Sequence, residues 1–217
     1  MPLGTTTAEG ISPAFLGLLA AEPLKERAVL DVGTGRGRLA LALAGRCRRV
    51  VGIDRDVAAI AEAVRRAGAL GLANVEFIIA DAEAVEYGAF APDLVAAHLC
   101  MSDAIAERAG RALGKGQVFA FVAFHADQWR ETGRRSRFAY GEAQARGLLE
   151  RTGFEVERLE VDREVKTFAS VEEALAAVVA LEEKWRVDGR WFRYIKFLEE
   201  GGRTLTRAHL IVKARHR

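Results

Sequence analysis

Apolar residues follow two alternating patterns along this chain. Short runs of aliphatic and β-branched residues, typical of buried strands, alternate with stretches in which apolar residues return every three or four positions, typical of helices. The runs predict strands over residues 28–32, 49–54, 74–81, 92–101, 116–124, 153–159 and 205–214. The helical stretches lie over residues 12–21, 36–45, 56–71, 102–113, 141–152, 170–185 and 191–200. This alternation predicts an α/β fold with a parallel, doubly wound sheet and helices on both faces.

Several helix ends carry local signals. Ser12 followed by Pro13 is typical of a helix start, because a serine side chain caps the first turn and proline fits the first helical position. Ser170 and Glu173 have the spacing of a capping box, and Gly189 interrupts the helical pattern that follows. These signals support the predicted helix boundaries.

We expect a single domain over residues 1–217, a length that suits one sizeable core. Residues 1–27 are expected to form an N-terminal helical segment. Residues 166–203 are expected to be helices inserted between the sixth and seventh strands.

Composition limits the classes of partner. The net charge of +2 is small, so no general attraction to DNA or to a membrane surface is expected. No apolar run reaches the roughly 20 residues of a membrane span, and the first residues lack the pattern of a signal peptide. The two cysteines form no framework, and the four histidines show no metal-ligand spacing. We therefore expect a cytoplasmic protein without a metal; its oligomeric state is left open.

The segment at residues 28–37, AVLDVGTGRG, is the richest in candidate chemistry. A short strand ends near Asp31, and glycines follow at positions 33, 35 and 37 before the next helical stretch. Glycines allow a sharp turn and the close approach of a ligand, because a Cβ atom would block both. The first N–H groups of the following helix have no partner within it. The segment therefore predicts a site for a nucleotide-like ligand.

The spacing of the glycines narrows the choice of ligand. A dinucleotide-binding GxGxxG motif would place its third glycine at the position of Arg38, and no P-loop motif occurs in the chain. Two further strands end in acidic residues, Asp54 and Asp81. Since ligands of open α/β sheets bind outside the carboxyl ends of the strands, Asp31, Asp54 and Asp81 are expected to lie in a row at one edge of the sheet.

The pattern Asp-x-Gly-x-Gly-x-Gly, with the acids at the ends of the next two strands, resembles the class I S-adenosylmethionine (SAM) methyltransferases. The resemblance covers roughly residues 28–165. It implies a Rossmann-like sheet of seven mostly parallel strands in the order 3-2-1-4-5-7-6, with the last strand antiparallel. The turn at residues 113–116 departs from the family, because it lacks the proline often found there.

The resemblance also implies roles for individual residues. The glycine turn would lie along the methionine part of SAM, and Asp31 would help to orient the amino acid group. Asp54 would accept hydrogen bonds from the ribose hydroxyls. Asp81 would accept one from the adenine amine, and the N–H of Ala82 would reach a ring nitrogen. The residues expected to bind the cofactor are Asp31, Gly33, Thr34, Gly35, Gly37, Asp54, Arg55, Asp81, Ala82 and His98.

Two histidines are candidates for a general base. The methyl group of SAM is already activated, so alignment of the acceptor supplies much of the catalysis, and a base is needed only where the acceptor carries a proton. His98 lies near the end of the fourth strand and His125 just past the fifth. The structural alternatives are a partly buried histidine for His98 and a histidine on a surface loop for His125.

The acceptor is expected to be a small molecule; the motifs of adenine and cytosine amino-methyltransferases, of cytosine-C5 enzymes and of magnesium-dependent catechol-type enzymes are absent, which shortens the list of acceptors. An RNA or protein acceptor is the alternative within the family. The arginine-rich loop at residues 129–137 and a set of aromatic residues could contact the acceptor, or could be solvated surface and packed helix face. Those aromatic residues are Phe15, Trp129, Trp191, Phe192 and Tyr194. A nicotinamide-dependent oxidoreductase and a catalytically inactive SAM-binding module are the less favoured functions.

Overall fold

The computed structural model of the protein describes residues 10–217. The first nine residues of the predicted N-terminal segment, which also carry the prediction about a signal peptide, lie outside the described residues. The chain divides into two compact units. The first consists of the residues up to Ala123 together with Glu142–Glu160 and Ile211–Arg217, and the second consists of Phe124–Gly141 and Val161–Leu210.

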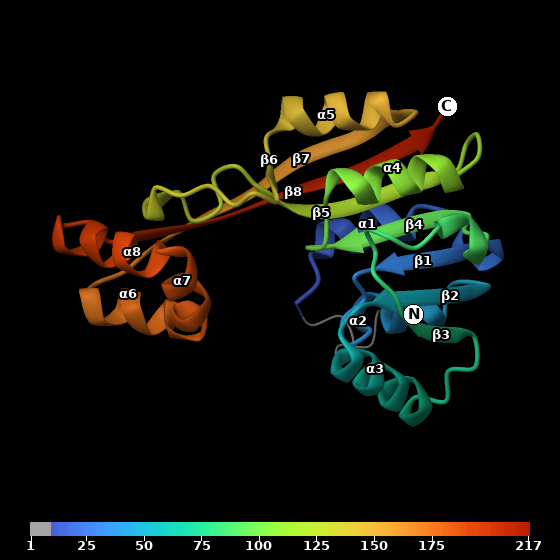
Figure 1. The fold of residues 1–217 in the computed structure, drawn as a ribbon, viewed down its shortest axis with the longest axis horizontal. Helices are drawn as coiled ribbons and strands as arrows, with labels where there is room; N and C mark the ends of the chain where they lie inside the picture. Colours follow the sequence, from blue (N-terminus) through green and yellow to red (C-terminus); the bar gives the residue numbers. More distant parts are fainter. Residues whose placement is uncertain (1–9) are drawn as a thin grey trace. The chain divides into compact units, whose positions relative to one another are not determined.

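The strands form one sheet in the order β3-β2-β1-β4-β5-β8-β7, with the short β6 beside β5 (Figure 1). The strands are β1 (Ala28–Val32), β2 (Arg49–Asp54), β3 (Val75–Ile79), β4 (Leu94–His98), β5 (Val118–His125), β6 (Ala139–Tyr140), β7 (Phe154–Thr167) and β8 (Thr204–His216). Because β6 is an extra strand of two residues, this order is the predicted 3-2-1-4-5-7-6 order, which is confirmed.

Strand directions follow from the hydrogen bonds. β1 to β5 are mutually parallel, with Asp31 beside Gly52 of β2 and Ala96 of β4. The end of β8 lies at the start of β5, because the N–H of His216 donates to the carbonyl of Gln117. The N–H of the last residue, Arg217, donates to Gly153 just before β7. β8 is therefore antiparallel to both neighbours, as expected.

The helices of the first unit flank the sheet on both faces (Figure 1). They are α1 (Pro13–Ala20), α2 (Arg38–Ala44), α3 (Val57–Ala69), α4 (Asp103–Ala112) and α5 (Glu142–Arg151). The Ser12 side chain accepts a hydrogen bond from the N–H of Phe15, so the predicted start of α1 is confirmed. No helix within residues 10–217 is long and apolar enough to cross a membrane.

The core of the first unit is built from the apolar runs that predicted the strands. Val29, Val50 and Ala120 are buried, and α1 and α2 cover them with residues such as Phe15 and Leu39. Complete burial of a side chain such as valine, leucine or phenylalanine stabilises the fold by about 1.5–3 kcal/mol. Packing of the strands therefore fixes where each strand ends, and so fixes the carboxyl edge of the sheet.

The second unit contains α6 (Val171–Val178), α7 (Glu182–Asp188) and α8 (Arg190–Glu199). They pack around Trp185, Trp191 and Tyr194, all buried. The predicted aromatic face of the last helix is therefore a packed face for Trp191 and Tyr194.

The largest differences between predicted and observed boundaries lie in three elements. The sixth strand continues to Thr167, because its mostly polar residues lie exposed at the edge of the sheet and give no apolar run. The fourth strand ends at His98, since Leu99 adopts the left-handed conformation with φ of 58°. The predicted helix at 170–185 is interrupted by a 3-10 turn at Val179–Leu181. Val178 precedes that turn with ψ of 4°, outside the α-helical range.

Two glycines in the middle of helices test the packing of the first unit. A Cβ atom at Gly110 would overlap the carbonyl oxygen of Thr152, whereas at Gly147 the nearest atom belongs to the flexible side chain of Arg151. We expect Gly110→Ala to destabilise the protein by roughly 1–3 kcal/mol through overpacking. Gly147→Ala should stabilise it by about 0.5–1 kcal/mol through helix propensity. Urea unfolding of both variants would measure these changes in the free energy of unfolding. Equal changes in the two variants would contradict the packing of α4 against the end of α5.

Candidate functional site

The turn between β1 and α2 forms the floor of a cavity in the first unit. Gly33 and Gly35 have φ values of 68° and 53°, a conformation that side chains with a Cβ rarely adopt. A Cβ atom at Gly33 would overlap the sulfur of Cys100. At Gly35 a Cβ atom would meet nothing within 4 Å, and Gly35 lines the cavity. The turn therefore packs tightly at Gly33 and leaves open space over Gly35.

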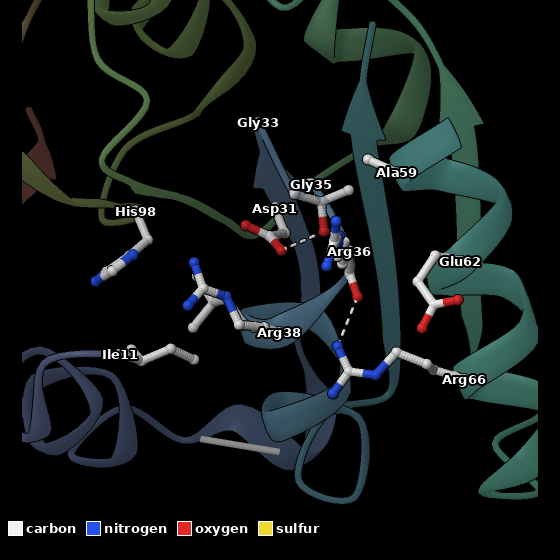
Figure 2. Close-up of a pocket in the computed structure, with 12 residues that line it drawn as sticks. Ile11, Asp31, Gly33, Gly35, Arg36, Arg38, Ala59, Glu62, Arg66 and His98 are labelled. Carbon is white, nitrogen blue, oxygen red and sulfur yellow. Dashed lines mark hydrogen bonds between the residues drawn. The ribbon is translucent and has the colours of Figure 1, made fainter. Parts of the chain in front are cut away.

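The cavity has a volume of about 690 Å³. Figure 2 shows Asp31, His98 and Arg38 facing it from different elements. The lining residues are Ile11, Asp31, Gly33, Thr34, Gly35, Arg36, Arg38, Leu39, Ala59, Glu62, Arg66 and His98. Four predicted cofactor residues near the end of β1, together with His98, are therefore brought together.

Asp31 is a buried carboxyl group at the end of β1. Its Oδ2 atom accepts hydrogen bonds from the hydroxyl of Thr34, at 2.6 Å, and from the N–H of Ala40, at 3.1 Å. Burial, which is the largest cause, and the nearby Asp54 carboxylate raise the pKa of Asp31, and these two hydrogen bonds oppose the rise; the net result is a pKa of about 7. A cation placed in the cavity would favour its ionised form.

Asp54 joins the end of β2 to the glycine turn. One carboxylate oxygen accepts from the N–H of Gly35 at 2.8 Å, and the other accepts from the N–H of Asp56 at 2.9 Å. Asp54 is half-buried, and it contacts the turn without itself lining the cavity. Since an ionised carboxylate offers about four lone-pair sites, it can still accept two more hydrogen bonds.

The third predicted acid lies at the next strand end. The N–H of Ala80 donates to the carbonyl of Asp54, which places the end of β3 beside the end of β2. Asp81 is exposed, and its carboxylate accepts from the N–H of Glu83. The cavity is not lined by Arg55, Asp81, Ala82 or Gly37.

The two candidate histidines lie at the ends of neighbouring strands, β4 and β5. His98 lines the cavity, and its ring centre lies 6.0 Å from that of the buried Phe15. His125 is buried in the second unit, and its Nδ1 atom accepts from the N–H of Asp127. In a neutral imidazole bonded in this way the proton lies on Nε2.

Several site residues were missed by sequence reasoning. Arg66 of α3 donates to the carbonyl of Arg36 at 2.9 Å and so holds the middle of the glycine turn (Figure 2). Cys100 packs against Gly33, and burial raises the pKa of its thiol to about 11. In the sequence, Arg38 is distinguished only as the residue at the third glycine position of a dinucleotide-binding GxGxxG motif. No local sequence pattern marks Arg66 or Cys100 as site residues, because the positions of both depend on the tertiary structure.

The sequence profile of the methyltransferase domain family matches residues 24–179, which include the glycine turn and the ends of β1 to β5. The chain belongs to this family. It is therefore a SAM-dependent methyltransferase, and its sheet is the class I methyltransferase fold.

Individual relatives agree with this assignment. The methyltransferase is 42% identical over 62 residues to a 23S rRNA (uracil-C5)-methyltransferase, RlmD, of Methylococcus capsulatus. This match spans 29% of the chain and 14% of the length of that relative. The YcgJ protein of Bacillus subtilis has a similar fold, with a TM-score of 0.71 at 16% identity over 94% of this chain and 98% of the other. Phosphoethanolamine N-methyltransferase 2 of Haemonchus contortus, solved with S-adenosylhomocysteine, gives a TM-score of 0.62 at 19% identity. That match covers 94% of this chain and 52% of the other.

The raised pKa of Asp31 predicts a pH dependence of stability. The folded state holds this proton up to about pH 7, whereas an unfolded Asp loses it near its ordinary pKa of 3.8. The contribution of Asp31 to the free energy of unfolding therefore falls as the pH rises through this range. We expect Asp31→Asn to become more stable relative to the wild type between pH 5 and pH 8, by about 1–3 kcal/mol.

Urea unfolding at several pH values would measure this difference, with Asp56→Asn as the control at an exposed cap. A difference between the wild type and Asp31→Asn that stays constant with pH would contradict the described burial of Asp31.

Proposed function

We propose that this methyltransferase binds SAM over the glycine turn and transfers the methyl group to a small-molecule acceptor. The observation that carries the proposal is the cavity whose floor is the turn at Gly33 and Gly35 and whose wall holds the Asp31 carboxylate. A Cβ atom at Gly35 would project into open space, so the backbone here is free to contact a ligand. A volume of about 690 Å³ is within the usual range for sites of small ligands.

The residues present fit the parts of SAM. In this proposal Gly33, Thr34 and Gly35 lie along the methionine portion, with Gly37 shaping the turn, and Asp31 faces the cationic amino group. Asp54 uses its two remaining acceptor sites for the ribose hydroxyls. The residues proposed for the adenine end are Arg55, Asp81 and Ala82.

When bound, SAM supplies a methyl group already activated by a positively charged sulfur. The chain then has to hold the acceptor in line and, where the acceptor carries a proton, to remove it. We assign proton removal to His98, because it lines the cavity beside the turn. His125 is less suited to this role, since its Nδ1 lone pair already accepts a backbone hydrogen bond.

The hydrogen bonds made by the arginine-rich loop at residues 129–137 favour a small acceptor over RNA. Arg134 donates to the carbonyl of Asp188 and Arg135 donates to the carbonyl of Ala139. Two of the loop arginines therefore have structural partners within the second unit. RNA remains the second candidate because of the match to RlmD, which covers 29% of the chain.

We also propose that the protein is cytoplasmic and that residues 1–217 function as one domain. The free thiols of Cys47 and Cys100 support the cytoplasmic location.

Binding of the cofactor is tested by thermal unfolding with S-adenosylhomocysteine and with NAD. A ligand at a hundredfold excess over its Kd adds about 2.7 kcal/mol to the free energy of unfolding. We expect a clear rise of the Tm with S-adenosylhomocysteine and none with NAD. A rise with NAD alone would point to the oxidoreductase alternative and contradict the proposal.

The role of Asp54 is tested by two neighbouring aspartates. Asp54→Ala should lower the affinity for S-adenosylhomocysteine about 10- to 150-fold, because it removes a charged acceptor of two hydrogen bonds. Asp56→Ala should leave that affinity unchanged, since Asp56 only caps α3 through the N–H groups of Ala58 and Ala59. Titration calorimetry measures both, and equal affinities in the two variants would show that the ribose binds elsewhere.

A further inference from the structure

Charged side chains of both signs line the cavity over the glycine turn. The acids are Asp31 and Glu62, and the arginines are Arg36, Arg38 and Arg66. All five belong to the first unit. The arrangement of these charges indicates which part of a ligand each of them can bind.

Arg36 and Arg66 lie near Glu62. Arg66 donates through Nη1 to the carbonyl of Arg36. The carboxylate of Glu62 accepts two hydrogen bonds from Arg65, and these bonds are the main reason why the pKa of Glu62 lies below its ordinary value. The positive charges of Arg66 and Arg36 lower this pKa further. An acid of the chain therefore already compensates part of the charge of Arg36 and Arg66.

Arg38 lies on the other side of the cavity. Figure 2 shows its guanidinium on the side of Asp31 and His98, away from Glu62. A Cβ atom at Gly10 would overlap Nη1 of Arg38, so the chain just before α1 lies against the guanidinium. The positive charge of Arg38 is therefore placed at the cavity wall close to the end of β1.

Asp31 and Arg38 face this cavity without forming an ion pair with each other. Within residues 10–217, the carboxyl group of Asp31 accepts hydrogen bonds only from Thr34 and Ala40, which are neutral donors. A cation in the cavity would favour the ionised form of Asp31, and an anion would be attracted to Arg38. The two side chains therefore suit a ligand that carries a cation and an anion close together. The amino acid end of SAM is such a group, since one carbon atom bears both its ammonium and its carboxylate.

We propose that Arg38 binds the carboxylate at the amino acid end of SAM, and that the protein selects its cofactor by this carboxylate. The guanidinium is planar and offers paired N–H donors, so it can bind both oxygens of a carboxylate. Arg38 is a better candidate than Arg36 or Arg66, because it lies on the same side of the cavity as Asp31. This inference rests on the proposed function and adds a specificity-determining residue to its site.

The test compares two ligands that differ only in this carboxylate. They are S-adenosylhomocysteine and its decarboxylated form, whose side chain ends in an aminopropyl group. Titration calorimetry with the full chain measures both affinities. We expect the wild type to bind S-adenosylhomocysteine about tenfold more tightly, because the carboxylate adds charge-assisted hydrogen bonds. Equal binding of the two ligands by the wild type would overturn the proposal.

Arg38→Met removes the charge and keeps a side chain that suits a helix. We expect this variant to bind S-adenosylhomocysteine about tenfold more weakly than the wild type does, and to bind the decarboxylated form within about twofold of the wild type. The decarboxylated ligand thus reports whether the turn is intact, since a distorted turn would weaken the binding of both ligands. Equal losses for the two ligands would show that Arg38 only supports the structure, against the proposal.

Two further variants separate charge from geometry and from position. Arg38→Lys keeps the charge but loses the paired donors, so it should retain a preference of about three- to fivefold for S-adenosylhomocysteine. Arg36→Met is the matched control, because it removes the same charge from another residue of the cavity lining. Its ratio of the two affinities should equal that of the wild type. A preference lost in Arg36→Met and kept in Arg38→Met would assign the carboxylate to Arg36 and contradict the proposal.

The wild type distinguishes failure of this inference from failure of the proposed function. If the wild type binds neither ligand, the proposed function is wrong and the role of Arg38 is wrong with it. If the wild type binds S-adenosylhomocysteine and Arg38→Met keeps the full preference, only the role of Arg38 is wrong.

Discussion

The hydrogen bond from the N–H of Gly35 to Asp54 holds the candidate site together. It joins the glycine turn after β1 to the end of β2, and its length of 2.8 Å suits a charge-assisted bond. On the other side of the turn, Arg66 binds the carbonyl of Arg36. The turn is therefore fixed before any ligand arrives, and binding would cost little conformational entropy.

Two buried carboxyl groups of the first unit, Glu22 and Asp31, differ in the charge of their partners. Glu22 pairs with Lys213 and Arg215, whose hydrogen bonds and charges bring its pKa below the ordinary value despite burial. Asp31 accepts hydrogen bonds from neutral donors, and burial raises its pKa to about 7. Glu22 is therefore compensated by the protein itself. Asp31 would gain most from a cationic ligand, which matches the amino group of SAM.

The sequence predicted those features that depend on local pattern. The bounds of β1 and β2 agree with the apolar runs that end near Asp31 and at Asp54, because burial selects such runs directly. Contacts between distant segments could not be predicted in this way. The packing of Cys100 on Gly33 depends on the left-handed Leu99, and the position of Trp129 depends on the pairing of residues 128–131 with β8. Both arise from tertiary hydrogen bonds that leave no periodic signal.

A crystal structure of the protein with S-adenosylhomocysteine would show directly whether the glycine turn and Asp54 hold the cofactor. We expect the ribose hydroxyls within hydrogen-bonding distance of Asp54, the amino acid portion beside Asp31 over Gly35, and the adenine near Asp81. A ligand bound with its ribose away from Asp54, or a glycine turn that rearranges and loses the Gly35–Asp54 hydrogen bond, would contradict this expectation.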